Sequence, residues 1–269
     1  MTYKLGVIGA GNMAKAIVKG IIASGIISAT DIIASARSQS TLDLVSSSLG
    51  IDTTLDNQKV VRESSYILLA VKPYMIESVL KDVITCLSGE QTLISIAAGV
   101  TLEQLESMTG GSIKLYRAMP NTPATVNEGM TSLCTTLSQS LSSSKFVYEI
   151  FSSIGKCEWI SEAHIHAAIA VHGSSPAYAY MMIEAMGDAG VLLGLSREQS
   201  YRMAAQSLLG AAKMVLESDL HPGALKDQVT SPGGTTIEAV AALEKGGFRS
   251  SLIEAMKHCA EKSIEMSKP

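Results

Sequence analysis

The most constraining feature of the chain is a glycine-rich turn near its N-terminus. It follows the apolar run Leu5–Ile8 and opens a helix-like segment that runs from Asn12 to Ser24. A strand, a turn with two glycines and a helix in this order are typical of the first βα unit of a dinucleotide-binding sheet. Such a turn places backbone N–H groups at the positive end of a helix, so it predicts a pyrophosphate site. The turn consists of Gly9, Ala10, Gly11, Asn12, Met13 and Ala14.

Residues 1–160 alternate short apolar runs with helical patterns. The run Tyr66–Val71 is typical of a strand buried on both faces of a parallel sheet. The segment Pro73–Cys86 suits a helix with proline in its first turn. Further strands are expected at Ile32–Ala34, Leu93–Ile96 and Ile113–Tyr116. This alternation predicts an α/β N-terminal domain with a Rossmann-like, doubly wound sheet.

Residues 161–269 are predicted to form an all-α C-terminal domain for substrate binding and oligomerisation. Helices are expected at 176–193, 196–218, 236–245 and 248–267, and the second opens with the capping-box spacing Ser196–Gln199. The helix at 176–193 is apolar nearly all round, so it is either central to this domain or covered by another subunit.

The stretch Ile165–Ile183 carries no charged residue and has to be distinguished from a membrane span. His172 and Pro176 lie in its middle, together with glycine and serines, and these residues are costly in lipid. The stretch is therefore interpreted as two buried helices broken by a loop.

Composition narrows the class of protein. With 269 residues, of which 46% are hydrophobic and 17% charged, the chain can form two domains with a large core. A net charge of −4 without a dense Lys/Arg cluster disfavours nucleic acid as a partner. The four cysteines form no CxxC pair, so no metal site or disulfide framework is predicted. No signal peptide is expected before the first strand, and a cytoplasmic protein is predicted.

The end of the second expected strand indicates which nicotinamide cofactor is bound. Sites for NAD place Asp or Glu there, but Asp31 lies at the beginning of this strand. The strand ends instead in Ser35, Ala36, Arg37 and Ser38. Hydroxyls and a guanidinium suit a 2′-phosphate, so NADPH is predicted, with NADH used less efficiently.

Two further strand ends complete the predicted cofactor site. The residues Val71–Pro73 follow a buried strand at its carboxyl end, where ligands bind in open sheets. Lys72 is expected to rim the cofactor rather than to act as a catalytic amine. The small residues of Ile96–Gly99 leave room for a nicotinamide ring.

The segment Val229–Thr236 predicts a site for a small anion. It combines the adjacent glycines Gly233 and Gly234 with serine and threonine hydroxyls, so that backbone N–H groups and polar side chains are exposed together. A dinucleotide site and a small-anion site in one chain indicate a redox enzyme with a small carboxylate substrate.

Several motifs together closely resemble the pyrroline-5-carboxylate reductase family over nearly the whole chain. Besides the glycine-rich turn and Val71–Pro73, they are Arg117–Pro123, Gly173–Tyr178, Glu184–Gly190, and the most specific part, Asp227–Ala239 followed by Gly246–Arg249. His172 and Ser175 depart from the residues expected in this family, and both departures concern the wall of the substrate pocket.

The resemblance implies NADPH-dependent reduction of L-1-pyrroline-5-carboxylate to L-proline, the final step of proline biosynthesis. Hydride would pass from C4 of the nicotinamide to the imine carbon, and Thr236 would be the catalytic hydrogen-bond partner of the ring nitrogen. The substrate-binding residues so implied are Glu162, Ser231, Gly233, Gly234, Thr235 and Thr236. The other reading of the two threonines is that one of them caps the following helix.

The pattern and the resemblance together predict the cofactor contacts. The predicted residues are Ile8, Gly9, Ala10, Gly11, Asn12, Met13, Ser35, Arg37, Asn57, Ala70, Val71, Lys72, Pro73 and Ala98. The resemblance also implies a homo-oligomer, a dimer or a ring of dimers, formed through the C-terminal helices.

A cyclic imine is basic enough to be protonated before hydride arrives, so the enzyme needs no strong acid and works by positioning and electrostatics. The histidines are therefore expected to be structural or on the surface, with His172 at most lining the pocket. These residues are His164, His166, His172, His221 and His258.

Two alternatives remain open. A β-hydroxyacid dehydrogenase shares the N-terminal turn and a helical second domain, and would use a lysine such as Lys213 as its acid–base group. The loop Ser231–Thr236 has no place in that scheme. A non-catalytic NADPH-binding sensor is the other alternative.

Overall fold

The structure of the chain is a computed structural model that describes residues 1–111 and 113–267. Its contacts group the chain into two units, Met1–Gly173 together with the chain from Cys259 onward, and Ser174–His258. The sequence places the division after residue 160, close to the end of the last strand, β8 (Gly155–Trp159). The contacts place it after Gly173 and return the end of helix α12 (Phe248–Met266) to the first unit.

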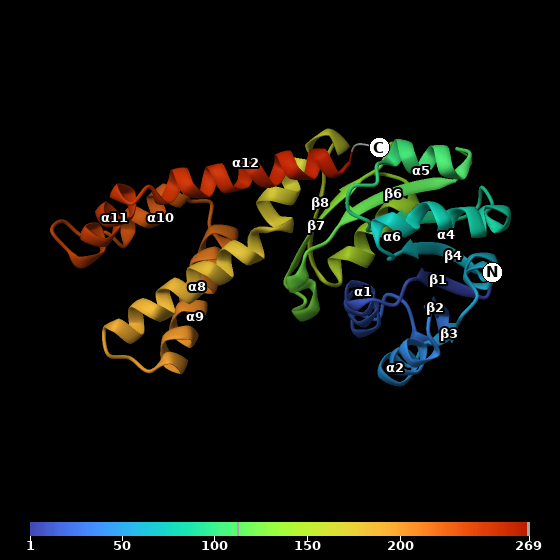
Figure 1. Cartoon of the computed structure of the whole chain (residues 1–269), viewed down its shortest axis with the longest axis horizontal. Coiled ribbons are helices and arrows are strands. Elements are labelled where there is room, and N and C mark those ends of the chain that lie inside the picture. The colour runs from blue at the N-terminus through green and yellow to red at the C-terminus, as the bar shows by residue number, and fades with distance from the viewer. Residues whose placement is uncertain (112, 268–269) are drawn as a thin grey trace. The chain divides into compact units, whose positions relative to one another are not determined.

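The first unit is built on an eight-stranded sheet with the order β3-β2-β1-β4-β5-β6-β7-β8 (Figure 1). Neighbouring strands are parallel except for β6 and β7, which are antiparallel. The direction of winding changes between β1 and β4, as in a doubly wound sheet, so the predicted fold class is confirmed. The remaining strands are β1 (Tyr3–Ile8), β2 (Ile32–Ser35), β3 (Asp52–Thr54), β4 (Ser64–Leu69), β5 (Thr92–Ser95), β6 (Lys114–Met119) and β7 (Gly129–Cys134).

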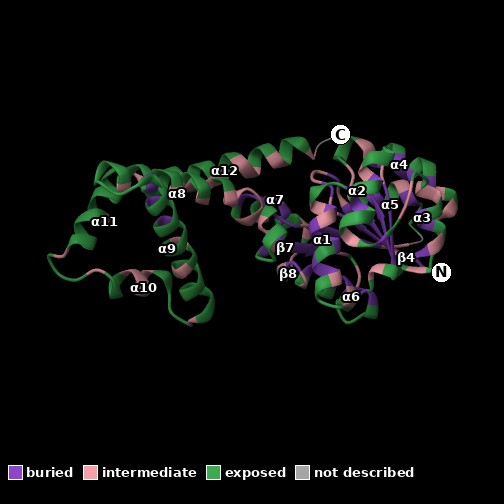
Figure 2. Ribbon diagram, turned by 90° about the horizontal axis from the view of Figure 1, so that it is seen from below, coloured by how far each residue is buried: buried purple, intermediate pink, exposed green. Residues whose placement is uncertain are grey.

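Helices cover both faces of this sheet, and each face has its own apolar core. Ile17 of α1 and Phe151 of α6 belong to one core, and Val83 of α4 and Leu105 of α5 belong to the other. The helices of the first unit are α1 (Asn12–Ala23), α2 (Gln39–Leu49), α3 (Asn57–Glu63), α4 (Ile76–Val83), α5 (Leu102–Thr109), α6 (Ser142–Ser152) and α7 (Ile165–Ala168). Figure 2 shows the buried residues concentrated in and beside the sheet.

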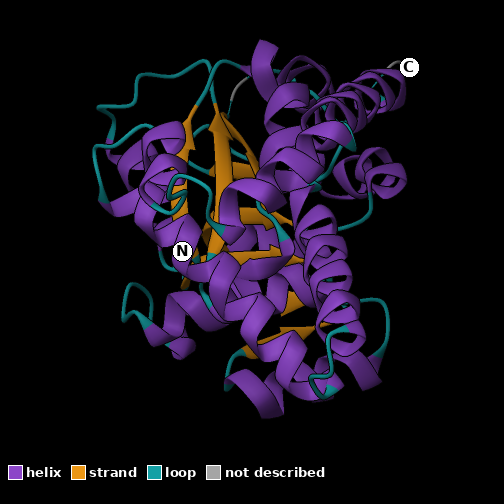
Figure 3. Cartoon of the chain, turned by 90° about the vertical axis from the view of Figure 1, so that its left-hand side faces the viewer, coloured by secondary structure: helices purple, strands orange, loops and turns teal. Residues whose placement is uncertain are grey.

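The second unit is helical, as predicted, with strands confined to the first unit among the described residues (Figure 3). The predicted capping box is confirmed, since the Ser196 hydroxyl accepts a hydrogen bond from the Gln199 N–H at 3.3 Å. Gly187 and Gly190 lie against α9. A Cβ on Gly187 would overlap Tyr201, and a Cβ on Gly190 would overlap Ser200. Besides the first part of α12, the unit contains α8 (Ser175–Leu192), α9 (Arg197–Glu217), α10 (Pro222–Gln228) and α11 (Thr235–Lys245).

The prediction of a loop inside Ile165–Ile183 is wrong. Helix α7 continues into a π-helical turn, Ile169–Gly173, and α8 follows directly. A π turn widens the helix without leaving its backbone groups unpaired, so the polar residues of this stretch need no loop. Helix α8 is not buried within the single chain, where Met181 is 67% and Leu192 88% exposed, which leaves the other expected alternative, coverage by another subunit. Among the described residues, no helix is both long and apolar enough to span a membrane.

Candidate active site

A pocket of about 940 Å³ lies in the first unit, at the carboxyl ends of β1, β2, β4 and β5. All of the predicted cofactor-binding residues line it, from Ile8 to Ala98. The prediction omitted Thr41, Leu55, Met119 and Pro120, which also line it. Met119 is the last residue of β6. Because ligands bind at the carboxyl ends of the strands in such a sheet, this position could have identified Met119 as a pocket residue.

The glycine-rich turn leaves space where a pyrophosphate would bind. Gly9 has a φ of +98°, and a Cβ there would lie 2.8 Å from the Ala70 carbonyl oxygen, so only glycine fits. Around Gly11 no atom lies within 4 Å of the position of a Cβ. Gly11 is also the N-cap of α1 and makes no side-chain capping bond, which leaves the first N–H groups of this helix for an anion. The turn fits a dinucleotide phosphate.

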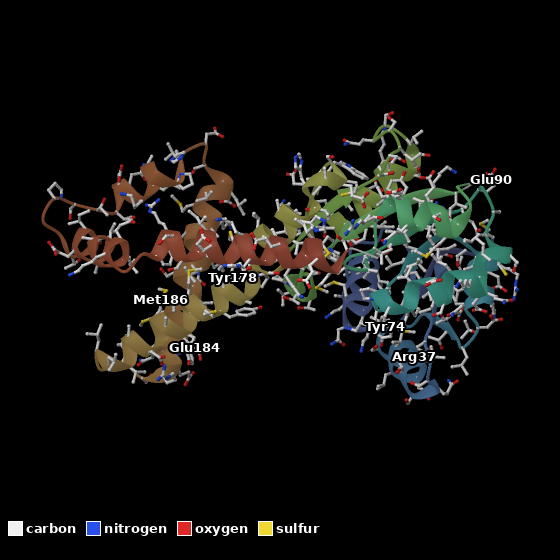
Figure 4. All side chains as sticks on the ribbon, turned by 45° about the horizontal axis from the view of Figure 1, so that its top comes forward. Arg37, Tyr74, Glu90, Tyr178, Glu184 and Met186 are labelled. Carbon is white, nitrogen blue, oxygen red and sulfur yellow. The ribbon has the colours of Figure 1, made fainter. Side chains whose placement is uncertain are left out.

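The end of β2 supplies polar groups to the same pocket. The Ser35 hydroxyl is fully buried and donates to Asn57 Oδ1 at 2.7 Å, so that Ser35 orients the Asn57 amide. Ser38 caps α2, and Arg37 beside it forms no ion pair among the described residues. Figure 4 shows Arg37 next to α2. Asp31 ends a 3₁₀ turn before β2, as expected. An unpaired guanidinium and an oriented amide suit a 2′-phosphate.

The opposite part of the lining comes from small and apolar residues. Ala97 and Ala98 follow β5, and Met119 and Pro120 end β6. Lys72 lines the pocket with an exposed side chain, which agrees with a place at its rim. This region can hold an uncharged ring such as nicotinamide.

Glu162 lies in the first unit and contacts groups of that unit. Its Oε1 accepts from the Leu102 N–H at 2.9 Å and from Arg117 Nη1 at 2.7 Å. The Arg117 side chain is 2% exposed and that of Glu162 28%. The substrate contact of Glu162 that the resemblance implies stays a prediction.

The other predicted substrate residues belong to the loop before α11 in the second unit. The loop turns through Gly233, with a φ of +68°, and the Gly234 N–H donates to the Ser231 carbonyl at 3.0 Å. Gly234 is the N-cap of α11 and makes no side-chain capping bond. The alternative that a threonine caps this helix is therefore not supported, because the extended backbone of Gly234 occupies the cap and the helix starts at Thr235. The hydroxyls of Thr235 and Thr236 lie on exposed residues at its first turn.

His166, His172 and His221 have structural partners, and His164 is exposed, as expected for histidines that are structural or on the surface. His172 Nε2 lies 2.7 Å from the Ser132 hydroxyl, and His166 Nδ1 lies 2.8 Å from the Ser263 hydroxyl. Burial lowers the pKa of both rings, and for His166 the positive charge of Arg117 lowers it further. His221 Nδ1 accepts from the Gly223 N–H and caps α10.

The four cysteines form no disulfide, and burial raises the pKa of Cys134 and of Cys157 to about 11. These two side chains therefore stay protonated at neutral pH and are poor nucleophiles.

The doubly wound sheet and the pocket at its topological switch are those of a dinucleotide-binding domain. Residues 4–99 match the family described as NADP oxidoreductase coenzyme F420-dependent, and residues 162–266 match the one described as pyrroline-5-carboxylate reductase dimerisation. The pyrroline-5-carboxylate reductase of Escherichia coli K12 is 48% identical over 268 residues, with 100% of both chains covered. That of Methanosarcina acetivorans is 40% identical, with 98% of both chains covered.

Solved structures agree with these relatives. A pyrroline-5-carboxylate reductase from Coxiella burnetii superposes with a TM-score of 0.93 at 35% identity over 100% of both chains. The Plasmodium falciparum enzyme, solved with NADP bound, has a TM-score of 0.87 at 35% identity over 99% of this chain and 98% of that one. The chain belongs to the pyrroline-5-carboxylate reductase family and is an NADP-dependent oxidoreductase.

This family membership favours an enzyme over a non-catalytic sensor and displaces the β-hydroxyacid dehydrogenase alternative. A β-hydroxyacid dehydrogenase would need Lys213 as its acid–base group. This lysine instead forms a surface ion pair with Glu217 on α9 at 3.5 Å.

Proposed function

We propose that this chain reduces L-1-pyrroline-5-carboxylate to L-proline with NADPH, the final step of proline biosynthesis. The observation that carries the proposal is full-length identity of 48% to a curated pyrroline-5-carboxylate reductase. The pocket of the first unit and the Ser231–Thr236 loop support it, since they provide a dinucleotide site and groups for a small carboxylate.

Different residues of the chain bind different parts of the cofactor and of the substrate. The N–H groups at the start of α1 would hold the pyrophosphate, while Arg37 and Asn57 would hold the 2′-phosphate. Ala97 and Ala98 would line the place of the nicotinamide, which would supply the hydride. In the second unit, the Thr235 and Thr236 N–H groups in the first turn of α11 bind the substrate carboxylate, and the Thr236 hydroxyl hydrogen-bonds the ring nitrogen.

This arrangement needs no protein acid at the reacting atom. The imine nitrogen takes its proton from solvent before reduction, and the site then has to orient the iminium ion and exclude competing water. The exposed hydroxyls of Thr235 and Thr236, and the structural partners of the histidines, agree with a mechanism of this kind.

The direct test follows nicotinamide absorbance on mixing purified protein, NADPH and pyrroline-5-carboxylate, with proline determined in the product. We expect NADPH consumption and proline formation in equal amounts. A Gly9→Val control should abolish both, because a side chain at Gly9 meets the Ala70 carbonyl. Absence of proline with folded wild-type protein would contradict the proposed substrate.

Cofactor preference tests the assignment of Arg37. We expect higher kcat/KM with NADPH than with NADH, and Arg37→Ala should narrow the difference by about 10- to 100-fold, the worth of one charge-assisted hydrogen bond of ~1.5–3 kcal/mol. Lys19→Ala removes an exposed cation of α1 and should leave the ratio unchanged. Equal efficiency with both cofactors, unaffected by Arg37→Ala, would show that Arg37 does not recognise the 2′-phosphate.

The assembly and location belong to the same proposal. A homo-oligomer, as a dimer or a ring of dimers joined by the helical part, is supported by the exposed apolar side chains of α8 and by the matched dimerisation family. A cytoplasmic location is supported by the four cysteines, which form no disulfide.

A further inference from the structure

The loop between β5 and α5, residues 96–101, forms one wall of the cofactor pocket. Ile96, Ala97 and Ala98 line the pocket, and Gly99 turns the chain with a φ of +80°. At the β5 end, the Ile96 N–H donates to the Leu69 carbonyl at 3.1 Å. The position of Ala97 and Ala98 therefore also depends on what holds the loop at its other end.

Glu162 forms a hydrogen bond at the α5 end of the loop. Its Oε1 accepts from the N–H of Leu102, the first residue of α5, at 2.9 Å, although the two residues are 60 positions apart in the chain. A carboxylate at this place also faces the positive end of the helix. The bond from Leu102 to Glu162 is made by a backbone N–H directly after the loop. It therefore restrains the loop whatever side chains the loop carries.

The same oxygen of Glu162 accepts from Arg117 Nη1 at 2.7 Å. The Arg117 side chain is almost completely buried, and its Nη2 has no partner among the described residues. Losing the carboxylate would leave a buried guanidinium uncompensated and would at the same time release Leu102. Arg117 thus ties Glu162 to β6, whose last residue, Met119, also lines the pocket.

The last turn of α12 supports the middle of the same loop. A Cβ on Gly99 would lie 3.2 Å from the Met266 carbonyl oxygen, so the two backbones are in close approach. The Ser263 hydroxyl, one turn earlier, contacts His166 of α7. The loop is therefore restrained by the bond from Leu102 to Glu162 at its α5 end and by the close approach of α12 at Gly99.

We propose that Glu162 is a positioning residue for NADPH, which fixes the β5–α5 loop through Leu102 and Arg117 so that Ala97 and Ala98 form the nicotinamide wall. This proposal rests on the proposed function, because that function identifies the cofactor as NADPH. It differs from the substrate contact that the family resemblance implies, because here Glu162 acts on cofactor binding through the backbone of the loop.

The test measures the Kd of NADPH by nicotinamide fluorescence without substrate, and then the KM of pyrroline-5-carboxylate at saturating NADPH. Glu162→Ala should raise the Kd about 10-fold or more, because both bonds to Oε1 are lost. Glu162→Gln should raise it less, since the amide oxygen can still accept from Leu102 while the charge facing Arg117 is gone. Glu158→Ala, an exposed glutamate of β8, is the control and should change neither constant.

An unchanged Kd for NADPH in both variants would overturn the proposal, and a raised KM for the imine alone would assign Glu162 to the substrate instead. If Glu162→Ala does not fold, the Kd of Glu162→Gln decides. The Kd of NADPH is measured without substrate, so it tests this inference even if the enzyme reduces a different imine. Failure of the proposed substrate can therefore be distinguished from failure of the proposed role of Glu162.

Discussion

At the residue scale, the hydroxyl of Thr236 is free to act on a ligand because Gly234 already provides the helix cap. If Thr236 contacts the reacting nitrogen, Thr236→Ala should lower kcat by about 10- to 100-fold, the worth of one hydrogen bond to a charged group. The Tm and the Kd of NADPH should barely change, since α11 loses no capping bond. Full turnover in a folded Thr236→Ala variant would remove this residue from the mechanism. Thr236→Ser, which keeps the hydroxyl, is the matched control.

The partly buried ring of His172 predicts that the stability of the chain depends on pH. Burial lowers its pKa in the folded chain, where the ring contacts Ser132. Below about pH 6.5 the unfolded chain therefore binds protons that the folded chain does not, so the free energy of unfolding falls as the pH decreases. Thermal unfolding between pH 8 and pH 5.5 should show a Tm that falls less steeply in His172→Gln than in the wild type. Identical slopes in His172→Gln and the wild type would contradict this role of His172.

At the scale of elements, the packing of α8 on α9 depends on Gly187. A side chain there overlaps the ring of Tyr201, so Gly187→Val should separate the helices and lower the free energy of unfolding by about 1–3 kcal/mol. Gly210→Ala on α9 is a matched control, because no atom lies within 4 Å of its added Cβ. That variant should be stabilised by about 0.5–1 kcal/mol, as expected for alanine in a helix interior. Urea unfolding measures both, and a neutral Gly187→Val would show that this contact is dispensable.

Elements with local signals were predictable, and long-range contacts were not. The buried strand of Tyr66–Val71, the glycine-rich turn and the capping box of α9 are each encoded by neighbouring residues, and the structure confirms all three. The π turn before α8 was missed because a widened turn has no distinct hydrophobic period. The bond from Leu102 to Glu162 joins residues 60 positions apart, and no pattern in either segment indicates it.

At the scale of the whole molecule, the apolar surface of α8 is too exposed for a chain that acts alone. Tyr180 and Met181 are 60% and 67% exposed, so light scattering at low micromolar concentration should find at least a dimer. Met181→Glu should weaken this association, because it places a charge where apolar contact is expected. Leu44→Glu, at an exposed leucine of α2, is the control and should leave the mass unchanged. A fully active monomer would contradict the assembly.

Helix α12 returns the end of the chain to the first unit, where Met266 meets Gly99 of the β5–α5 loop. The first unit is therefore discontinuous in sequence, because the loop that lines the cofactor pocket packs against residues far downstream of it. During translation the sheet can form early, but the wall beside Ala97 and Ala98 reaches its final packing only after α12 has been made and has folded back. Binding of NADPH is thus expected to tighten late in folding, after the sheet has formed.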